Sequence, residues 1–203
     1  MTHTLVGTGV ARLAAARREW LPQLAVTAIG AGLLPDADSW LYLIDDSYYG
    51  RYHRVFSHSI WALAILAVVS VLLARAVTTP GIARRFGWFV TPNLPREGDV
   101  PTRVPWKLMF LVAFASVYLH LLGDSFTGFG NVLPLWPWSP WDASMHAVSS
   151  FDVVIFSTTI AWHLGTRQLE WPRRREAWLT AGYCVLIAVY VAGRLAWGEP
   201  TVW

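Results

Sequence analysis

Residues 57–77 read SHSIWALAILAVVSVLLARAV, and this stretch decides the fold class of the chain. A helix needs about 20 mostly apolar residues to cross the hydrocarbon core of a bilayer, and this run supplies them. Two further runs, Pro105–Gly123 and Trp178–Trp197, meet the same requirement, and Val148–Leu164 falls slightly short of it. The sequence therefore predicts an integral membrane protein.

The N-terminal part is apolar in two shorter pieces, Thr4–Ala16 and Trp20–Leu34. Runs of about 13 to 15 residues are nearer the length of core helices than of full spans, so we expect a short helical hairpin packed against the longer helices. The expected fold is an all-α, polytopic membrane helical bundle of about six membrane helices, the first two short. We expect residues 1–203 to form a single integral membrane domain.

The composition excludes a soluble domain and a disordered chain. Hydrophobic residues make up 55% of the 203 residues and charged residues 14%, whereas a soluble domain carries roughly a quarter charged residues. Disordered chains are poor in apolar residues. The 13 tryptophans suit a membrane interface, where amphipathic rings gather. Cys184 is the single cysteine, and we expect it to be a small buried hydrophobic residue.

The basic residues predict the orientation of the chain. Most of them fall between apolar runs in three clusters that share one face if each run crosses once: Arg12, Arg17 and Arg18; Arg75, Arg84, Arg85, Arg96, Arg103 and Lys107; and Arg167 with Arg173–Arg175. The positive-inside rule makes that face cytoplasmic in a bacterial-type plasma (inner) membrane. Both termini and a histidine- and aspartate-rich face then point outward, and no nucleic-acid partner is expected.

Two carboxylates follow the second apolar run, in LLPDADS (residues 33–39). If the turn at Pro35 holds the backbone irregular, Asp36 and Asp38 could both reach one cation. An Asp-x-Asp after proline is equally typical of a capped turn.

Two histidines precede the longest run, in HRVFSHS (residues 53–59). Ser57 is expected to cap the helix, because its hydroxyl can accept an unpaired amide hydrogen of the first turn. A fold-back would bring His53 and His58 to one metal; the alternative is a pair of interfacial histidines. Arg54 suits a phosphate or a carboxylate, or pairs with an acidic neighbour such as Asp45.

His120 and Asp124 end the fourth apolar run, four residues apart. On a helix this spacing puts both side chains on one face, where imidazole and carboxylate form a common half-site for a divalent ion. An ionisable group within hydrocarbon is unfavourable unless paired, which favours a site. The alternative is a buried His–Asp hydrogen bond.

Other polar residues of the same face are weaker candidates. His3 begins the first run and is expected at the same outer level. Asp142, His146 and Asp152 could add a ligand, but are better explained as loop residues and a helix cap. His163 is expected to be a helix-end residue without a role in the site.

Seven residues together provide four imidazoles and three carboxylates: His3, Asp36, Asp38, His53, His58, His120 and Asp124. Zinc is the first candidate for the divalent metal, with manganese and iron as alternatives. Seven ligands exceed the needs of one ion, and two ions would suit hydrolysis of a phosphate ester. In that chemistry Asp38 would orient the attacking water, and Arg54 would hold a phosphate oxygen.

The loop that follows reads SFTGFGNVLPLWPWSP (residues 125–140), and its glycines and prolines exclude a continuous helix. Its aromatic side chains are expected at the headgroup level: Phe126, Phe129, Trp136, Trp138 and the following Trp141. Such a loop could admit a lipid from the side, or serve only as an interfacial anchor.

In this order the motifs resemble a known family. LLPDxD (residues 33–38), HRxxSHS (53–59) and HxxxDxxTxxG (120–130) with the Trp-Pro that follows are similar to the membrane-bound metal-dependent hydrolases of the YdjM type, over residues 3–139. The resemblance implies a small multi-helix membrane protein, a metal-dependent hydrolase, with the seven residues above as ligands and Arg54 and Thr127 beside them. Two departures are Ser39, where the family often has a histidine or another polar ligand residue, and Val55, where glycine is common.

Three functional hypotheses follow. The first is a membrane-embedded hydrolase that cleaves a phosphate or other ester of a lipid-like substrate, with membrane lipid as its partner. The second is a metal or proton transporter, although transporter sites lie near the midplane and these residues gather at one face. The third, a non-catalytic membrane scaffold, leaves the ligand set unexplained.

Overall fold

The computed structural model describes residues 2–44, 47, 52–78, 103–127, 131–145, 147–148, 152–168 and 173–197. Within these ranges the chain is helical, with one isolated β-bridge between Thr127 and Val148. The helices are α1 (Thr2–Ala14), α2 (Leu21–Leu33), α4 (Ile60–Val77), α6 (Trp106–Phe126), α7 (Val153–Gln168) and α8 (Arg173–Trp197), with 3-10 segments η1 (Arg18–Trp20) and η2 (Leu34–Leu43). The predicted all-α class is confirmed, and each predicted apolar run overlaps one of these helices over most of its length, with ends that differ by up to five residues.

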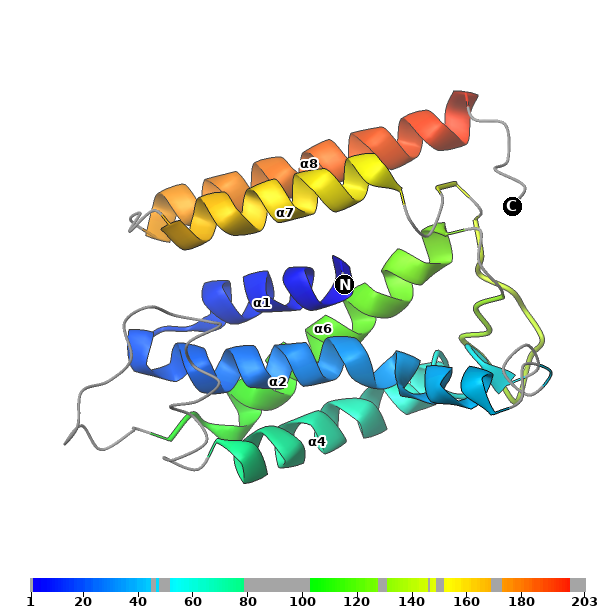
Figure 1. Ribbon diagram of the computed structural model, residues 1–203, viewed down its shortest axis with the longest axis horizontal. Helices are drawn as coiled ribbons and strands as arrows, with labels where there is room; N and C mark the ends of the chain where they lie inside the picture. The colour runs from blue at the N-terminus through cyan, green and yellow to red at the C-terminus, as the bar shows by residue number, and fades with distance from the viewer. Residues whose placement is uncertain are drawn as a thin grey trace.

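Helix α2 lies at the centre of the main layer, in contact with α1, α4 and α6 (Figure 1). One face of α2 is fully buried and consists mainly of small residues, among them Ala25, Ala28 and Ala31. The predicted packing of the α1–α2 hairpin against the longer helices is confirmed.

Small residues allow these helices to approach closely. A Cβ atom on Gly7 of α1 would lie 2.9 Å from the Ala28 carbonyl oxygen of α2 and 3.4 Å from Ser116 Oγ of α6. Ser70 Oγ of α4 donates a 2.7 Å hydrogen bond to the Thr27 carbonyl of α2. Lipid tails are as apolar as leucine, so helices within a bilayer associate through such close packing and hydrogen bonds.

Among the described residues, three helical segments are long and apolar enough to cross a membrane: Ile60–Val77, Trp106–Phe126 and Arg175–Ala196. Helices α1 and α2 have 13 residues each, which corresponds to about 20 Å and is short of the bilayer core of about 30 Å. The first two helices are therefore short, as predicted. Six crossings stay a prediction.

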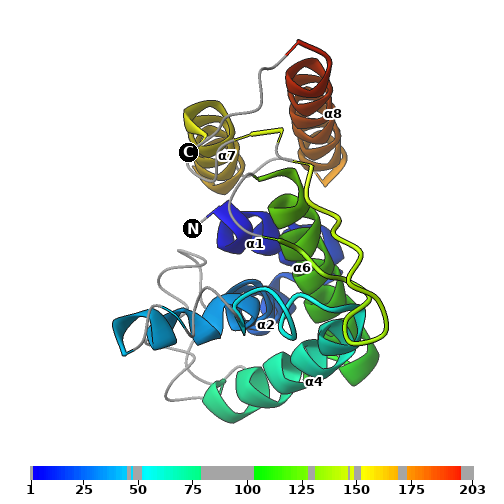
Figure 2. The same ribbon diagram turned by 90° about the vertical axis from the view of Figure 1, so that its right-hand side faces the viewer.

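Helices α7 and α8 form a second layer beside α1 and α6 (Figure 2). Most side chains of α8 face outward, and Cys184 is exposed. The prediction of a buried Cys184 is wrong, because an apolar helix in a bilayer can present its side chains to lipid instead of to protein.

The ends of the helices gather at two opposite ends of the molecule (Figure 1). One end contains the α1–α2 turn, the C-terminal ends of α4 and α7, and the N-terminal ends of α6 and α8. Arg12 in the last turn of α1 pairs there with Glu176 in the first turn of α8, at 2.9 Å. The described residues of the three predicted basic clusters thus share an end, whereas Arg54 and Arg194 lie at the other; which side of the membrane the basic end faces stays a prediction.

Candidate metal centre

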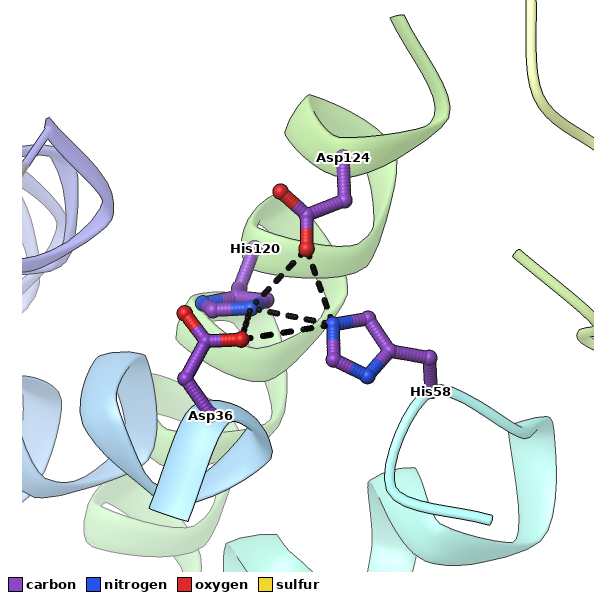
Figure 3. A group of neighbouring side chains, drawn as sticks. All are labelled: Asp36, His58, His120 and Asp124. Atoms are coloured by element: carbon purple, nitrogen blue, oxygen red, sulfur yellow. Dashed lines mark hydrogen bonds and ion pairs between the residues drawn. The ribbon is translucent and has the colours of Figure 1, made fainter. Parts of the chain in front are cut away.

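Four side chains converge at the other end of the bundle, as Figure 3 shows. They are Asp36 of η2, His58 in the turn before α4, and His120 and Asp124 of α6. One potential ligand atom from each lies within 4.8 Å of the others. His58, His120 and Asp124 are buried, whereas the Asp36 side chain is 40% exposed.

The turn before α4 places His58, and the sequence prediction of its helix cap was wrong by two residues. Ser59 caps α4: its backbone is extended (φ −84°, ψ 156°) and its hydroxyl accepts from the Ala62 amide at 3.3 Å. Ser57 Oγ instead lies 3.0 Å from His58 Nδ1. His58 therefore precedes the helix: Ser57 contacts its imidazole, and Ser59 caps the helix that follows.

Four of the distances within the group are close to those of a tetrahedral site, and the fifth, between His58 and Asp124, is that of a hydrogen bond. His120 Nε2 lies 3.3 Å from both His58 Nε2 and Asp124 Oδ2, and His58 Nε2 lies 2.8 Å from the same Asp124 oxygen. Asp36 Oδ1 lies 3.4 Å from His120 Nε2 and 3.7 Å from His58 Nε2. Four ligands about 2.05 Å from a zinc ion would be about 3.4 Å from one another. This group of two histidines and two aspartates could hold one divalent ion.

The orientation of His120 follows from the end of α2. Its Nδ1 lies 2.9 Å from the Gly32 carbonyl oxygen, which only accepts, so Nδ1 carries a proton and Nε2 is the ring nitrogen directed into the group, where a metal would bind it. Pro35 contributes to this contact because it has no N–H to give to the Gly32 carbonyl three residues earlier. Gly32 lies in the last turn of α2, where backbone carbonyls are available to side-chain donors.

The electrostatic surroundings of His58 and Asp36 also favour binding of a cation. Burial lowers the pKa of His58 below its ordinary value, which keeps the imidazole neutral as a metal ligand requires. Burial raises the pKa of Asp36, but the adjacent His120 imidazole outweighs this effect, so the pKa is lowered overall and the carboxylate stays charged. Asp36 Oδ1 is itself buried, and among the described residues His120 Nε2 at 3.4 Å and His58 Nε2 at 3.7 Å approach it without hydrogen-bond geometry. A bound cation would satisfy this oxygen.

Arg54 holds the opposite side of Asp124. Its buried guanidinium places NH2 3.2 Å from Asp124 Oδ1 and NH1 3.4 Å from Thr127 Oγ1. The Arg54 backbone is left-handed (φ 63°), which is uncommon for a non-glycine residue. The carboxylate partner anticipated for Arg54 is therefore Asp124 of the cluster; Asp45 lies outside the described residues.

His53 and Asp38 lie next to the four-residue group but are not part of it. His53 Nδ1 is 2.8 Å from Asp38 Oδ1, and His53 Nε2 is 3.9 Å from Asp36 Oδ1. The His53 and His58 rings are 5.6 Å apart between centroids, so the predicted fold-back brings them close. The predicted roles of His53 and Asp38 as ligands, and of Asp38 in orienting water, stay predictions.

Of the weaker candidates for the site, the structure describes the side chains of Asp142 and Asp152. Asp142 Oδ1 accepts from the Val132 and Ser144 amides within its loop, and Asp152 Oδ1 accepts from the first amides of α7, as expected for a helix cap. The His3 side chain and His146 lie outside the described residues. Sequence reasoning did not find the Gly32 carbonyl, because no side-chain pattern marks a backbone acceptor.

The comparisons with known proteins give a family. No curated protein and no solved structure matches the chain. A family model, described as YdjM inner membrane protein, matches residues 1–199, which is nearly the whole sequence. With its helices of membrane-crossing length and its His/Asp cluster, the chain belongs to the YdjM inner membrane protein family.

Proposed function

We propose that this protein is a membrane-embedded, metal-dependent hydrolase that cleaves a phosphate or other ester of a lipid-like substrate. The observation that carries the proposal is the buried group of Asp36, His58, His120 and Asp124, whose mutual distances suit one divalent ion. Zinc is the first candidate, because imidazole and carboxylate ligands in tetrahedral geometry suit it; manganese and iron are the alternatives.

A divalent ion in this group would supply Lewis acidity, which lowers the pKa of a coordinated water and so provides a nucleophile near neutral pH. The residues of the chain position this chemistry. The Gly32 carbonyl orients His120, and Arg54 holds the second oxygen of Asp124. The 40% exposed side chain of Asp36 is the open side of the group, where a substrate ester would approach.

His53 and Asp38 could extend the site on that side. Asp38 Oδ1 can accept a hydrogen bond from the His53 Nδ1–H group, and this contact directs His53 Nε2 towards Asp36. This pair could assist proton transfer or contribute ligands to a second ion. A measured metal stoichiometry of two would favour the second role.

The expected position of the site at a membrane surface supports a lipid-like substrate. The loop beside the site exposes Trp138 and Trp141, and Trp138 packs on Trp61 at the start of α4, with 4.5 Å between ring centroids. Tryptophans of this kind are enriched at headgroup level. The positive-inside bias of the sequence predicts that this end faces the outside of the cell.

The proposal is tested by the metal content of detergent-purified protein, followed by turnover of lipid phosphate esters. We expect stoichiometric zinc, manganese or iron in the wild type and loss of metal and turnover in His120→Ala. His163→Ala is the matched control, because His163 contacts Thr8 on α1, away from the cluster, and should leave both readouts unchanged. If the wild type binds no metal after divalent ions are added back, the hydrolase proposal is wrong.

A further inference from the structure

An apolar cavity of about 520 Å³ lies between α6, α7 and α8, on the side of α6 that faces the second layer. Leu119, Leu122 and Phe126 of α6 line one wall, and Ile187 and Val191 of α8 line another. Its volume falls within the range of about 300–1,000 Å³ typical of ligand pockets. Its lining is mainly hydrocarbon, so an apolar occupant fits it.

The polar groups in the lining are engaged with the protein. Tyr183 Oη shares a 2.5 Å hydrogen bond with Thr159 Oγ1. Asp152 Oδ1 caps α7, and its Oδ2 accepts from Tyr190 Oη at 2.8 Å. These groups therefore give the cavity little capacity to orient a polar ligand, whereas a hydrocarbon chain needs no such partner.

Thr127 connects the cavity to the metal centre. It lines the cavity, and its Oγ1 is 3.4 Å from Arg54 NH1, while Arg54 NH2 contacts Asp124. Leu122 and Gly123 line the cavity immediately before Asp124 in α6. An apolar chain in the cavity would thus have one end beside the polar residues of the cluster.

We propose that the cavity holds one hydrocarbon chain of a membrane lipid and thereby positions the lipid's ester beside the metal centre. The proposal rests on the proposed hydrolase function and names the substrate as an ester with a long acyl or alkyl chain. Because α6 and α8 are of membrane-crossing length, such a chain could enter from the bilayer without crossing water. Lipid tails are as apolar as the lining, so the cavity contributes position more than affinity.

The test uses tryptophan substitutions on two faces of α8. Ala188→Trp fills the cavity, since Ala188 lines it. Val189→Trp is the matched control: its side chain is 67% exposed and is not part of the lining. The probe is phosphatidic acid with a photoreactive diazirine at the end of one acyl chain, incorporated with the full-length, metal-loaded protein into phosphatidylethanolamine vesicles. Cross-linked peptides are identified by mass spectrometry, and metal content verifies the fold of each variant.

We expect cross-links on the lining residues of α6 and α8 in the wild type and in Val189→Trp, with a loss of about tenfold or more in Ala188→Trp. In the same variant, kcat/KM for a long-chain phosphate ester should fall, while that for a short-chain, water-soluble ester with the same headgroup should not. Cross-linking confined to outward residues, or equal in both variants, would overturn the proposal. Specific cross-linking without hydrolysis of any ester would uphold the chain-binding cavity and reject the hydrolase function.

Discussion

At the scale of single residues, the contact between Arg54 and Asp124 is the least expected feature of the site. The sequence suggested that Arg54 binds a phosphate or carboxylate, and the structure places its guanidinium between Asp124 and Thr127. Partners that hold metal ligands in orientation affect affinity almost as strongly as the ligands do. This contact supports a role for Arg54 in positioning Asp124.

We predict that Arg54→Lys weakens metal binding roughly 10- to 100-fold, because an ammonium group is compact and does not reproduce the planar fork that spans two partners. Competition with a chelator of known affinity measures the effect. Arg17→Lys, at an exposed position in the α1–α2 turn, should have no effect. Unchanged metal affinity together with a raised KM for phosphate esters would instead identify Arg54 as a phosphate-binding residue.

At the scale of helices, the packing depends on the close approach of α1 to α2 and α6. The Ala28 carbonyl is backbone and cannot move away from a side chain at Gly7 unless the helix moves. At Gly182 on α8, in contrast to Gly7, an added Cβ atom would meet no other atom within 4 Å. The two glycines therefore form a matched pair.

We predict that Gly7→Leu destabilises the protein by about 1–3 kcal/mol, the usual effect of forcing extra volume into a packed interface. Gly182→Leu should be neutral or slightly stabilising, because leucine favours helix more than glycine does. Thermal unfolding in detergent compares the two variants with the wild type. Equal unfolding temperatures for both variants would contradict the packing described for α1.

At the scale of the whole molecule, the basic end and the metal centre lie at opposite ends of the bundle. The positive-inside rule then predicts that the metal centre faces the outside. Single-cysteine variants in a Cys184→Ser background test this orientation in intact cells with a membrane-impermeant maleimide. Met145→Cys lies in the half-exposed loop beside the site, and Arg17→Cys lies in the turn at the basic end.

We expect Met145→Cys to react in intact cells and Arg17→Cys to react only after lysis. Reaction of both variants in lysed cells is the control for accessibility. The reverse pattern would place the metal centre in the cytoplasm and exclude an outer-leaflet substrate.

Much of the fold could be predicted from local sequence. Apolar runs of sufficient length specify helices in a bilayer, because every backbone polar group must be paired within its own segment. The His120–Asp124 contact could be predicted as well, since residues four apart share a helix face. By contrast, hydropathy did not predict correctly whether Cys184 is buried within the protein, because lipid and protein interior are equally apolar surroundings.

What the sequence determines by itself is a helical membrane protein with histidines and aspartates near the ends of its apolar runs. Only the tertiary structure selects Asp36, His58, His120 and Asp124 as one group and leaves His53 and Asp38 beside it. The physical reason is that these contacts join residues up to 88 positions apart, as between His120 and Gly32. Their geometry depends on how closely α2, α4 and α6 pack. Small residues permit this close packing, but no local spacing in the sequence predicts which residues it brings together.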